Sequence, residues 1–113
     1  MVFGINLLRQ EVNSGGFDRY FRYSGGDTAL DAARGAKILG PGWATLVQEA
    51  CRAIGSPYPI DTGSRAVAVD VLVEEQPELL ESFDDRFYQV ELDDPADERI
   101  DAFIWSNKSA FFV

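Results

Sequence analysis

The chain has 113 residues, of which 46% are hydrophobic and 12% aromatic, so we expect one compact domain over residues 1–113. Its net charge of −9 argues against direct binding to nucleic acid or to an anionic membrane, and favours a basic protein as partner. The absence of histidine and the single cysteine exclude an internal disulfide, most zinc sites and histidine-dependent catalysis, so we expect no enzyme, no metal and no cofactor.

The N-terminal segment predicts a short helix over residues 2–12, because Ile5, Leu8 and Val12 fall on one helical face. It lacks the basic leader and small-residue cleavage site of a secretory signal. No later apolar run approaches the roughly 20 residues that span a bilayer. We therefore expect a cytoplasmic protein with no membrane partner.

Two glycines and three large aromatic residues follow in the next nine positions. The glycines should end the first helix and reverse the chain, since they reach backbone conformations that cost other residues strain. The rings recur at i, i+3 and i+4, which predicts one buried face of the next helix rather than the wall of a ligand pocket. We therefore assign a structural role to Asn13, Gly15, Gly16, Phe17, Asp18, Tyr20 and Phe21.

The same stretch, E-V-N-S-G-G-F-D-R-Y-F from Glu11 to Phe21, resembles the signature of the DNA mimic protein family, whose members are small, acidic, helical bacterial proteins. The resemblance extends to about Trp105 through an alanine-rich helix, an amphipathic helix and a later aromatic-acidic segment. It implies an all-α fold. It also implies a non-catalytic protein that occupies the nucleic-acid-binding surface of a basic DNA-binding protein.

Glycine-bounded helices are predicted for the middle of the chain. Ser24–Gly26 should form a turn, with Asp27 or Thr28 capping a helix over 29–39 that has a small, alanine-rich face. The clearest amphipathic helix runs from Trp43 to Ile54, with Gly55 ending it. Its apolar face consists of Trp43, Leu46, Val47, Ala50, Cys51 and Ile54, which makes Cys51 a structural thiol rather than a nucleophile.

A short tetrapeptide, Asp61-Thr62-Gly63-Ser64, matches the sequence around the catalytic aspartate of aspartic proteases. Those enzymes need two such loops, so that two carboxylates share one proton. This chain has one copy in a mostly helical sequence. We therefore interpret Asp61 to Ser64 as a turn and a helix cap.

The valine run over residues 66–73 alternates as a strand does, and a two-stranded ribbon pairing 66–73 with 88–92 is the alternative to a helix. We favour a helix in which Asp70 and Glu74 form one solvent-exposed stripe while the valines pack against the protein on all other sides. A further helix should follow Pro77, with an apolar face of Leu79, Leu80, Phe83, Phe87 and Tyr88. A last helix should begin near Asp94-Pro95, with Ile100, Phe103 and Ile104 inward. The prediction is an all-α domain of about five to seven helices.

We expect residues 106–113 to form a C-terminal tail, and its apolar end predicts docking either on the rest of the domain or on a second copy, which would give a homodimer.

The acidic residues are distributed unevenly. Residues 1–69 hold six acids and seven bases, a net +1, whereas residues 70–101 hold thirteen acids and two arginines, a net −11; Lys108 adds one positive charge. Helical carboxylates three or four residues apart recur about every 5 Å and can approximate rows of phosphates. The alternative is a solvated helix surface that confers solubility. The candidate interface comprises Asp70, Glu74, Glu75, Glu78, Glu81, Asp84, Asp85, Glu91, Asp93, Asp94, Asp97, Glu98 and Asp101.

We predict two acidic stripes within this set. Glu74, Glu75, Glu78 and Glu81 form the first, and Asp94, Asp97, Glu98 and Asp101 the second, with the remaining acids after Glu81 placed in and around the turn between them. Three classes of function are consistent with the sequence. The favoured one is a DNA mimic that binds a basic protein. The others are an immunity or antitoxin-like protein that neutralises a basic toxin, and an acidic enzyme or purely structural domain.

Overall fold

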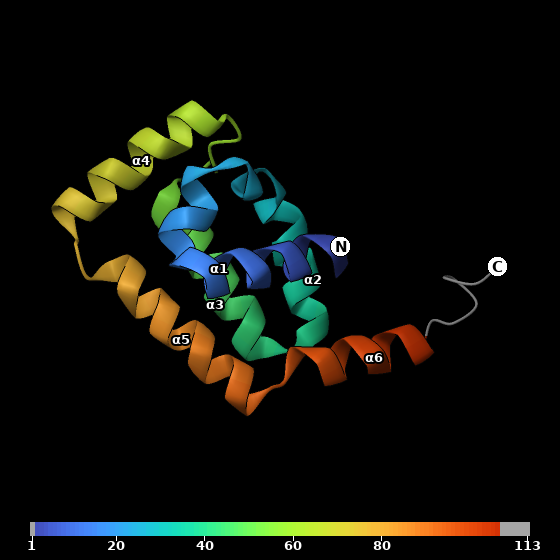
Figure 1. Ribbon diagram of the computed structural model, residues 1–113. Coiled ribbons are helices and arrows are strands. Elements are labelled where there is room, and N and C mark those ends of the chain that lie inside the picture. Colours follow the sequence, from blue (N-terminus) through green and yellow to red (C-terminus); the bar gives the residue numbers. More distant parts are fainter. Residues whose placement is uncertain (1, 107–113) are drawn as a thin grey trace.

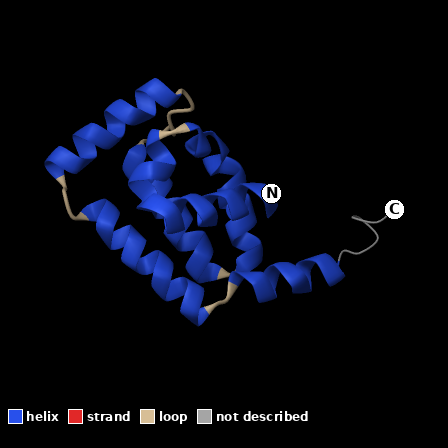
Figure 2. Cartoon of the chain, in the orientation of Figure 1, coloured by secondary structure: helices blue, strands red, loops and turns tan. Residues whose placement is uncertain are grey.

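The computed structural model describes residues 2–106, which form six α-helices and one 3-10 helix (Figure 1). The helices are α1 (Val2–Arg22), α2 (Ala29–Leu39), α3 (Pro41–Ile54), α4 (Thr62–Glu75), α5 (Leu79–Asp93) and α6 (Ala96–Ser106), and the 3-10 helix η1 (Ser24–Thr28) joins α1 to α2. The described residues contain no strand (Figure 2), so the all-α prediction is confirmed and the ribbon alternative is wrong. The C-terminal tail from residue 107 lies outside the described residues.

Helix α1 lies at the centre of the molecule, where it contacts α2, α4 and α5 (Figure 1). Phe17, Tyr20 and Phe21 are fully buried, as the aromatic spacing predicted. The Phe17 ring stacks on Phe21 at a centroid distance of 5.8 Å and meets Phe87 of α5 edge-on at 6.3 Å. Trp43 of α3 also meets Phe87 edge-on, at a centroid distance of 5.6 Å. This aromatic cluster joins three helices, so its rings are core and not pocket lining.

The break in α1 is confined to one residue. Gly16 has φ 77° and ψ 179°, and helical geometry resumes at Phe17. The prediction that the glycines end the first helix and reverse the chain is therefore wrong in its extent, because Asn13, Ser14 and Gly15 remain within the helix and only Gly16 leaves helical geometry. A side chain at Gly16 would be strained by the positive φ and would also lie 2.6 Å from a carboxylate oxygen of Asp84.

Helices α2 and α3 match the predicted pattern closely. Small residues on α2 are buried and let neighbouring helices approach: Ala29, Ala32, Gly35 and Ala36. All six residues of the predicted apolar face of α3 are buried. Gly40, at φ 126°, separates the two helices, and Pro41 begins α3, where a missing N–H costs nothing. The Trp43 indole donates a hydrogen bond to the Asp94 carbonyl at 2.9 Å, which ties α3 to the end of α5.

Helices α4, α5 and α6 run one after another along the outside of the molecule, and we call them the outer arm (Figure 1). We call the remaining elements, α1, η1, α2 and α3, the body. The expectation that the valines of α4 pack all round is wrong. Val69 and Leu72 are buried, whereas Val67, Val71 and Val73 are exposed, because α4 touches the body along only one face. No helix within residues 2–106 has the length and apolarity needed to cross a membrane.

The inner face of α5 also differs in part from the prediction. Leu80, Phe83 and Phe87 are buried and Leu79 is partly buried, as expected. Tyr88 is 48% exposed, however, because it lies one residue beyond Phe87 and so points away from the core. Ile100 of α6 is buried, and Ile104 packs partly against the core.

Candidate protein-interaction face

The thirteen acids of residues 70–101 lie on the outer arm and on the short connections within it. The first predicted stripe does not lie on one helix: Glu74 and Glu75 end α4, Glu78 precedes α5, and Glu81 lies in its first turn. These residues instead form a corner between two helices, because Pro77 interrupts the helical pattern. The turn predicted between the stripes is also wrong, since Asp84, Asp85, Glu91 and Asp93 all lie on α5.

Arginines of α1 and α6 neutralise part of the outer arm. Arg9 Nε donates to Glu91 at 2.7 Å, and its Nη1 donates to Asp97 at 3.1 Å. Arg22 bridges Asp18 of its own helix and Asp70 of α4, with distances of 2.8 and 2.6 Å. Arg99 pairs with Asp94 at 2.7 Å. These four outer-arm acids therefore join helices through ion pairs, and arginine compensates part of their charge even where the acid stays mostly exposed, as at Asp70 and Asp97.

Asp84 has a structural role that the sequence did not indicate. Its Oδ1 accepts the backbone N–H of Phe17 at 2.8 Å, which caps the helical segment that restarts after Gly16. Burial raises the pKa of Asp84, the bond from Phe17 opposes that shift, and the nearby carboxylates Asp85, Asp18 and Glu81 add to it, so the net pKa lies above its ordinary value. Asp84 thus belongs to the junction between α1 and α5 rather than to an open surface.

Seven acids of the outer arm are exposed and form no ion pair within residues 2–106: Glu74, Glu75, Glu78, Glu81, Asp85, Glu98 and Asp101. The first five lie where α4 meets α5, and we call them the acidic corner. Glu78, Glu81, Ser82 and Asp85 line a hollow of about 330 Å³ there. Asp93 is exposed too and accepts a hydrogen bond from Gln89 at 3.0 Å. The strongest uncompensated charge therefore lies at the acidic corner.

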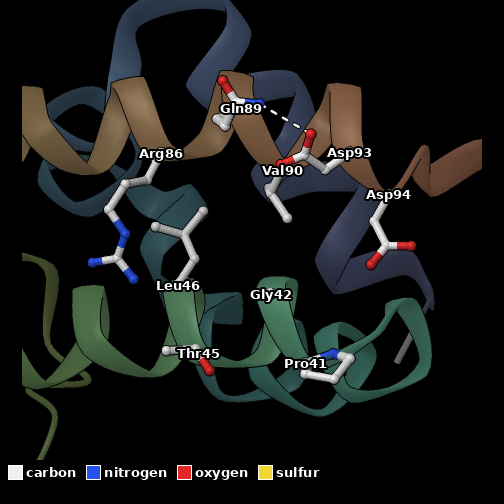
Figure 3. A pocket seen from close by; sticks show the side chains of 9 residues that line it. All are labelled: Pro41, Gly42, Thr45, Leu46, Arg86, Gln89, Val90, Asp93 and Asp94. Carbon is white, nitrogen blue, oxygen red and sulfur yellow. Dashed lines mark hydrogen bonds between the residues drawn. The ribbon is translucent and has the colours of Figure 1, made fainter.

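A second hollow, of about 470 Å³, lies between α3 and α5 (Figure 3). Figure 3 shows Leu46 of α3 and Val90 of α5 pointing into the hollow from facing helices, with Arg86 and Asp94 at opposite ends. Arg86 is paired with Glu49 of α3 and Asp94 with Arg99, so among the charged side chains that line this groove only Asp93 has no ion pair within the described residues. No group of three or more histidine, cysteine or carboxylate side chains in the described part of the chain could hold a metal ion.

The two candidate catalytic features have structural roles. Cys51 is buried, and burial raises the pKa of its thiol to about 12, so the thiolate nucleophile is scarce at neutral pH. Asp61 caps α4: its Oδ2 accepts the backbone N–H of Ser64 at 2.9 Å and the Ser64 hydroxyl at 3.0 Å. The interpretation of Asp61 to Ser64 as a turn and helix cap is confirmed.

Arg65 is the main residue that sequence reasoning missed. Its guanidinium is fully buried and donates to the carbonyls of Phe21 and Tyr23, each at 3.0 Å, and to that of Ile60. It also pairs with Asp27 at 2.7 Å. Arg65 thereby satisfies carbonyls at the end of α1 and in the connection before α4. A single charged residue on a helix gives no sequence signal of this kind.

The fold and this surface define a class of protein: a small all-α domain with a nearly neutral body and a carboxylate-rich outer arm. A family model described as DMP19-like protein matches residues 1–107, and the chain belongs to this family. The match confirms the resemblance to DNA mimic proteins that Glu11 to Phe21 suggested. Comparisons with curated proteins and with solved structures gave no significant match.

Proposed function

We propose that this protein is a non-catalytic DNA mimic whose outer arm binds the nucleic-acid-binding surface of a basic DNA-binding protein. One observation carries the proposal: in a member of the DMP19-like family, residues 70–101 hold a net charge of −11, and seven of their carboxylates are exposed without a partner among the described residues. A basic surface shaped for phosphates provides the cations that these carboxylates lack.

The arrangement of the acids supports a contact with more than one cationic side chain. Glu81 and Asp85 are about one helical turn apart on α5, so the two carboxylates follow one another along the helix and can approximate part of a row of phosphates. Glu74 and Glu75 extend the charge onto the end of α4. Arg22 pairs with Asp70 before the acidic corner, and Arg9 pairs with Glu91 and Asp97 after it. The acidic corner should therefore carry most of the interaction, with Glu98 and Asp101 of α6 forming a second, smaller site.

Competition with duplex DNA tests the proposal. The intact protein is used at low salt to recover a DNA-binding protein from a bacterial lysate, and that purified protein is titrated with labelled duplex in the presence of this chain. A mimic should release the duplex stoichiometrically, since both ligands need the same surface. A ternary complex with DNA still bound would contradict mimicry. Recovery of a toxin whose activity is blocked without DNA competition would favour the immunity-like alternative.

A further inference from the structure

One exposed face of α5 combines acids with apolar side chains. Glu81, Asp85, Tyr88 and Leu92 occur at i, i+4, i+7 and i+11, so they line one side of the helix. Tyr88 is 48% exposed and Leu92 is 78% exposed, and no described helix covers them. The opposite side of α5 packs into the core through Leu80, Phe83 and Phe87. We call the four exposed residues the α5 face.

The two ends of the α5 face have different chemistry. Glu81 and Asp85 belong to the acidic corner and have no ion pair among the described residues. Tyr88 and Leu92 extend the face by two further turns without any charge. A surface that only mimicked phosphates would gain nothing from an exposed tyrosine and leucine, because apolar area left in water is unfavourable.

We propose that the α5 face binds a basic protein surface that carries an apolar patch beside its arginines and lysines. This inference rests on the proposed function and specifies the chemistry of the partner. The acids pair with the basic side chains, and Tyr88 fills the apolar patch with Leu92 beside it. Tyrosine is among the residues that most often dominate the energy of protein interfaces. The apolar contact therefore selects among basic proteins, which charge alone attracts indiscriminately.

Charge complementarity favours this occupant over a second copy of the chain. A symmetric contact through the α5 face would bring Glu81 and Asp85 of one copy close to those of the other, and like charges across an interface are costly. The exposed valines of α4, Val67 and Val71, are a weaker candidate. Valine rarely dominates an interface, and the nearby Asp70 is already paired with Arg22.

Two synthetic basic peptides of equal length and charge provide the test. One contains only arginine and glutamine; in the other, phenylalanine and leucine replace some of the glutamines. Binding to the intact protein is measured by fluorescence anisotropy. Tyr88→Ser combined with Leu92→Ser should weaken binding of the apolar peptide about tenfold and leave the polar peptide unchanged. Val67→Ser with Val71→Ser, the matched control on α4, should change neither affinity. Leu92→Ser alone gives a second variant if the double change lowers the melting temperature.

The possible outcomes separate this inference from the proposed function. If Glu81→Gln with Asp85→Asn weakens binding of both peptides while the Tyr88 and Leu92 changes do nothing, the apolar contact is wrong and the acidic interface stands. If the two acid changes affect neither peptide, the α5 face is not the docking surface and this inference fails, while the proposed function is decided separately by the competition with duplex DNA. Equal losses from the α4 and α5 changes would overturn the assignment to α5. If the wild-type protein is a dimer and Leu92→Ser converts it to a monomer, a second copy of the chain occupies this face instead.

Discussion

The acids of residues 1–69 and those of residues 70–101 differ in what they contact. All six in the first region have an intramolecular partner: Glu11, Asp18, Asp27 and Glu49 pair with arginines, Asp31 accepts the Gly4 N–H, and Asp61 caps α4. In the second region seven of thirteen have none among the described residues. Exposed carboxylates without a structural role are therefore concentrated on the outer arm, and this concentration is more informative than net charge.

The body should be far more sensitive to substitution than the outer arm, and Phe21→Ala should show the largest effect. The ring is fully buried and contacts Phe17, Tyr20 and Tyr58, so its loss leaves a cavity. We expect the free energy of unfolding to fall by about 3–5 kcal/mol, measured by urea denaturation. An unchanged stability together with lost partner binding would instead identify the rings as a binding pocket.

The two adjacent glycines of α1 sharpen the comparison within the body. Gly16→Ala should lower the free energy of unfolding by about 1–3 kcal/mol, because φ is positive and the new methyl group would meet Asp84. Gly15→Ala separates the two causes. Gly15 is exposed and helical, so alanine there meets no backbone strain, but its methyl group would lie 2.5–2.9 Å from the Arg19 side chain, which must shift; we expect a smaller loss than at Gly16. A larger loss from Gly15→Ala than from Gly16→Ala would contradict the single-residue break.

Asp84 lies on the outer arm but stabilises α1 by accepting the backbone N–H of Phe17. Asp84→Ala should cost about 0.5–2 kcal/mol, since Phe17 loses its cap, whereas Asp84→Asn keeps an oxygen acceptor and should cost less. The raised pKa of Asp84 means that the folded state binds the proton more tightly than the unfolded state. Stability from this group is thus fully present below its ordinary pKa and is lost as pH rises through the folded pKa. As the pH is lowered, the free energy of unfolding of the wild-type chain should therefore rise relative to that of Asp84→Asn. A relative rise as the pH is increased would contradict this sign.

The acidic corner should be the most tolerant part of the chain. Changing Glu74, Glu78 and Glu81 together to glutamine should alter the free energy of unfolding by no more than about 0.5 kcal/mol, because these side chains are exposed and unpaired. Thermal melting checks this directly. A large loss of stability would show that the corner carries structure instead of an available binding surface.

Local sequence patterns predicted the helices well, but not which of their residues contact one another across helices. The spacing from Trp43 to Ile54 fixed the buried face of α3, and glycines marked the ends of α2 and α3. In α4 the alternating valines hid the narrow buried face of Val69 and Leu72. The pairings of Arg9 with Glu91 and of Arg22 with Asp70 join residues 82 and 48 positions apart, so no local pattern could indicate them. For this reason the acidic third of the chain could be identified from the sequence, but the acids within it that have no intramolecular partner could not.

The salt dependence of partner binding tests the central claim most directly. The dissociation constant for the recovered DNA-binding protein is measured between about 50 and 200 mM salt for the wild-type chain and two triple variants of equal charge. The variant of the acidic corner carries Glu74→Gln, Glu78→Gln and Glu81→Gln, and the control carries Glu11→Gln, Asp18→Asn and Glu49→Gln. We predict that the corner variant binds more weakly at low salt and with a shallower salt slope, while the control keeps the wild-type slope. Equal slopes for the two variants, or an affinity that does not change with salt, would contradict an interface formed by the outer arm.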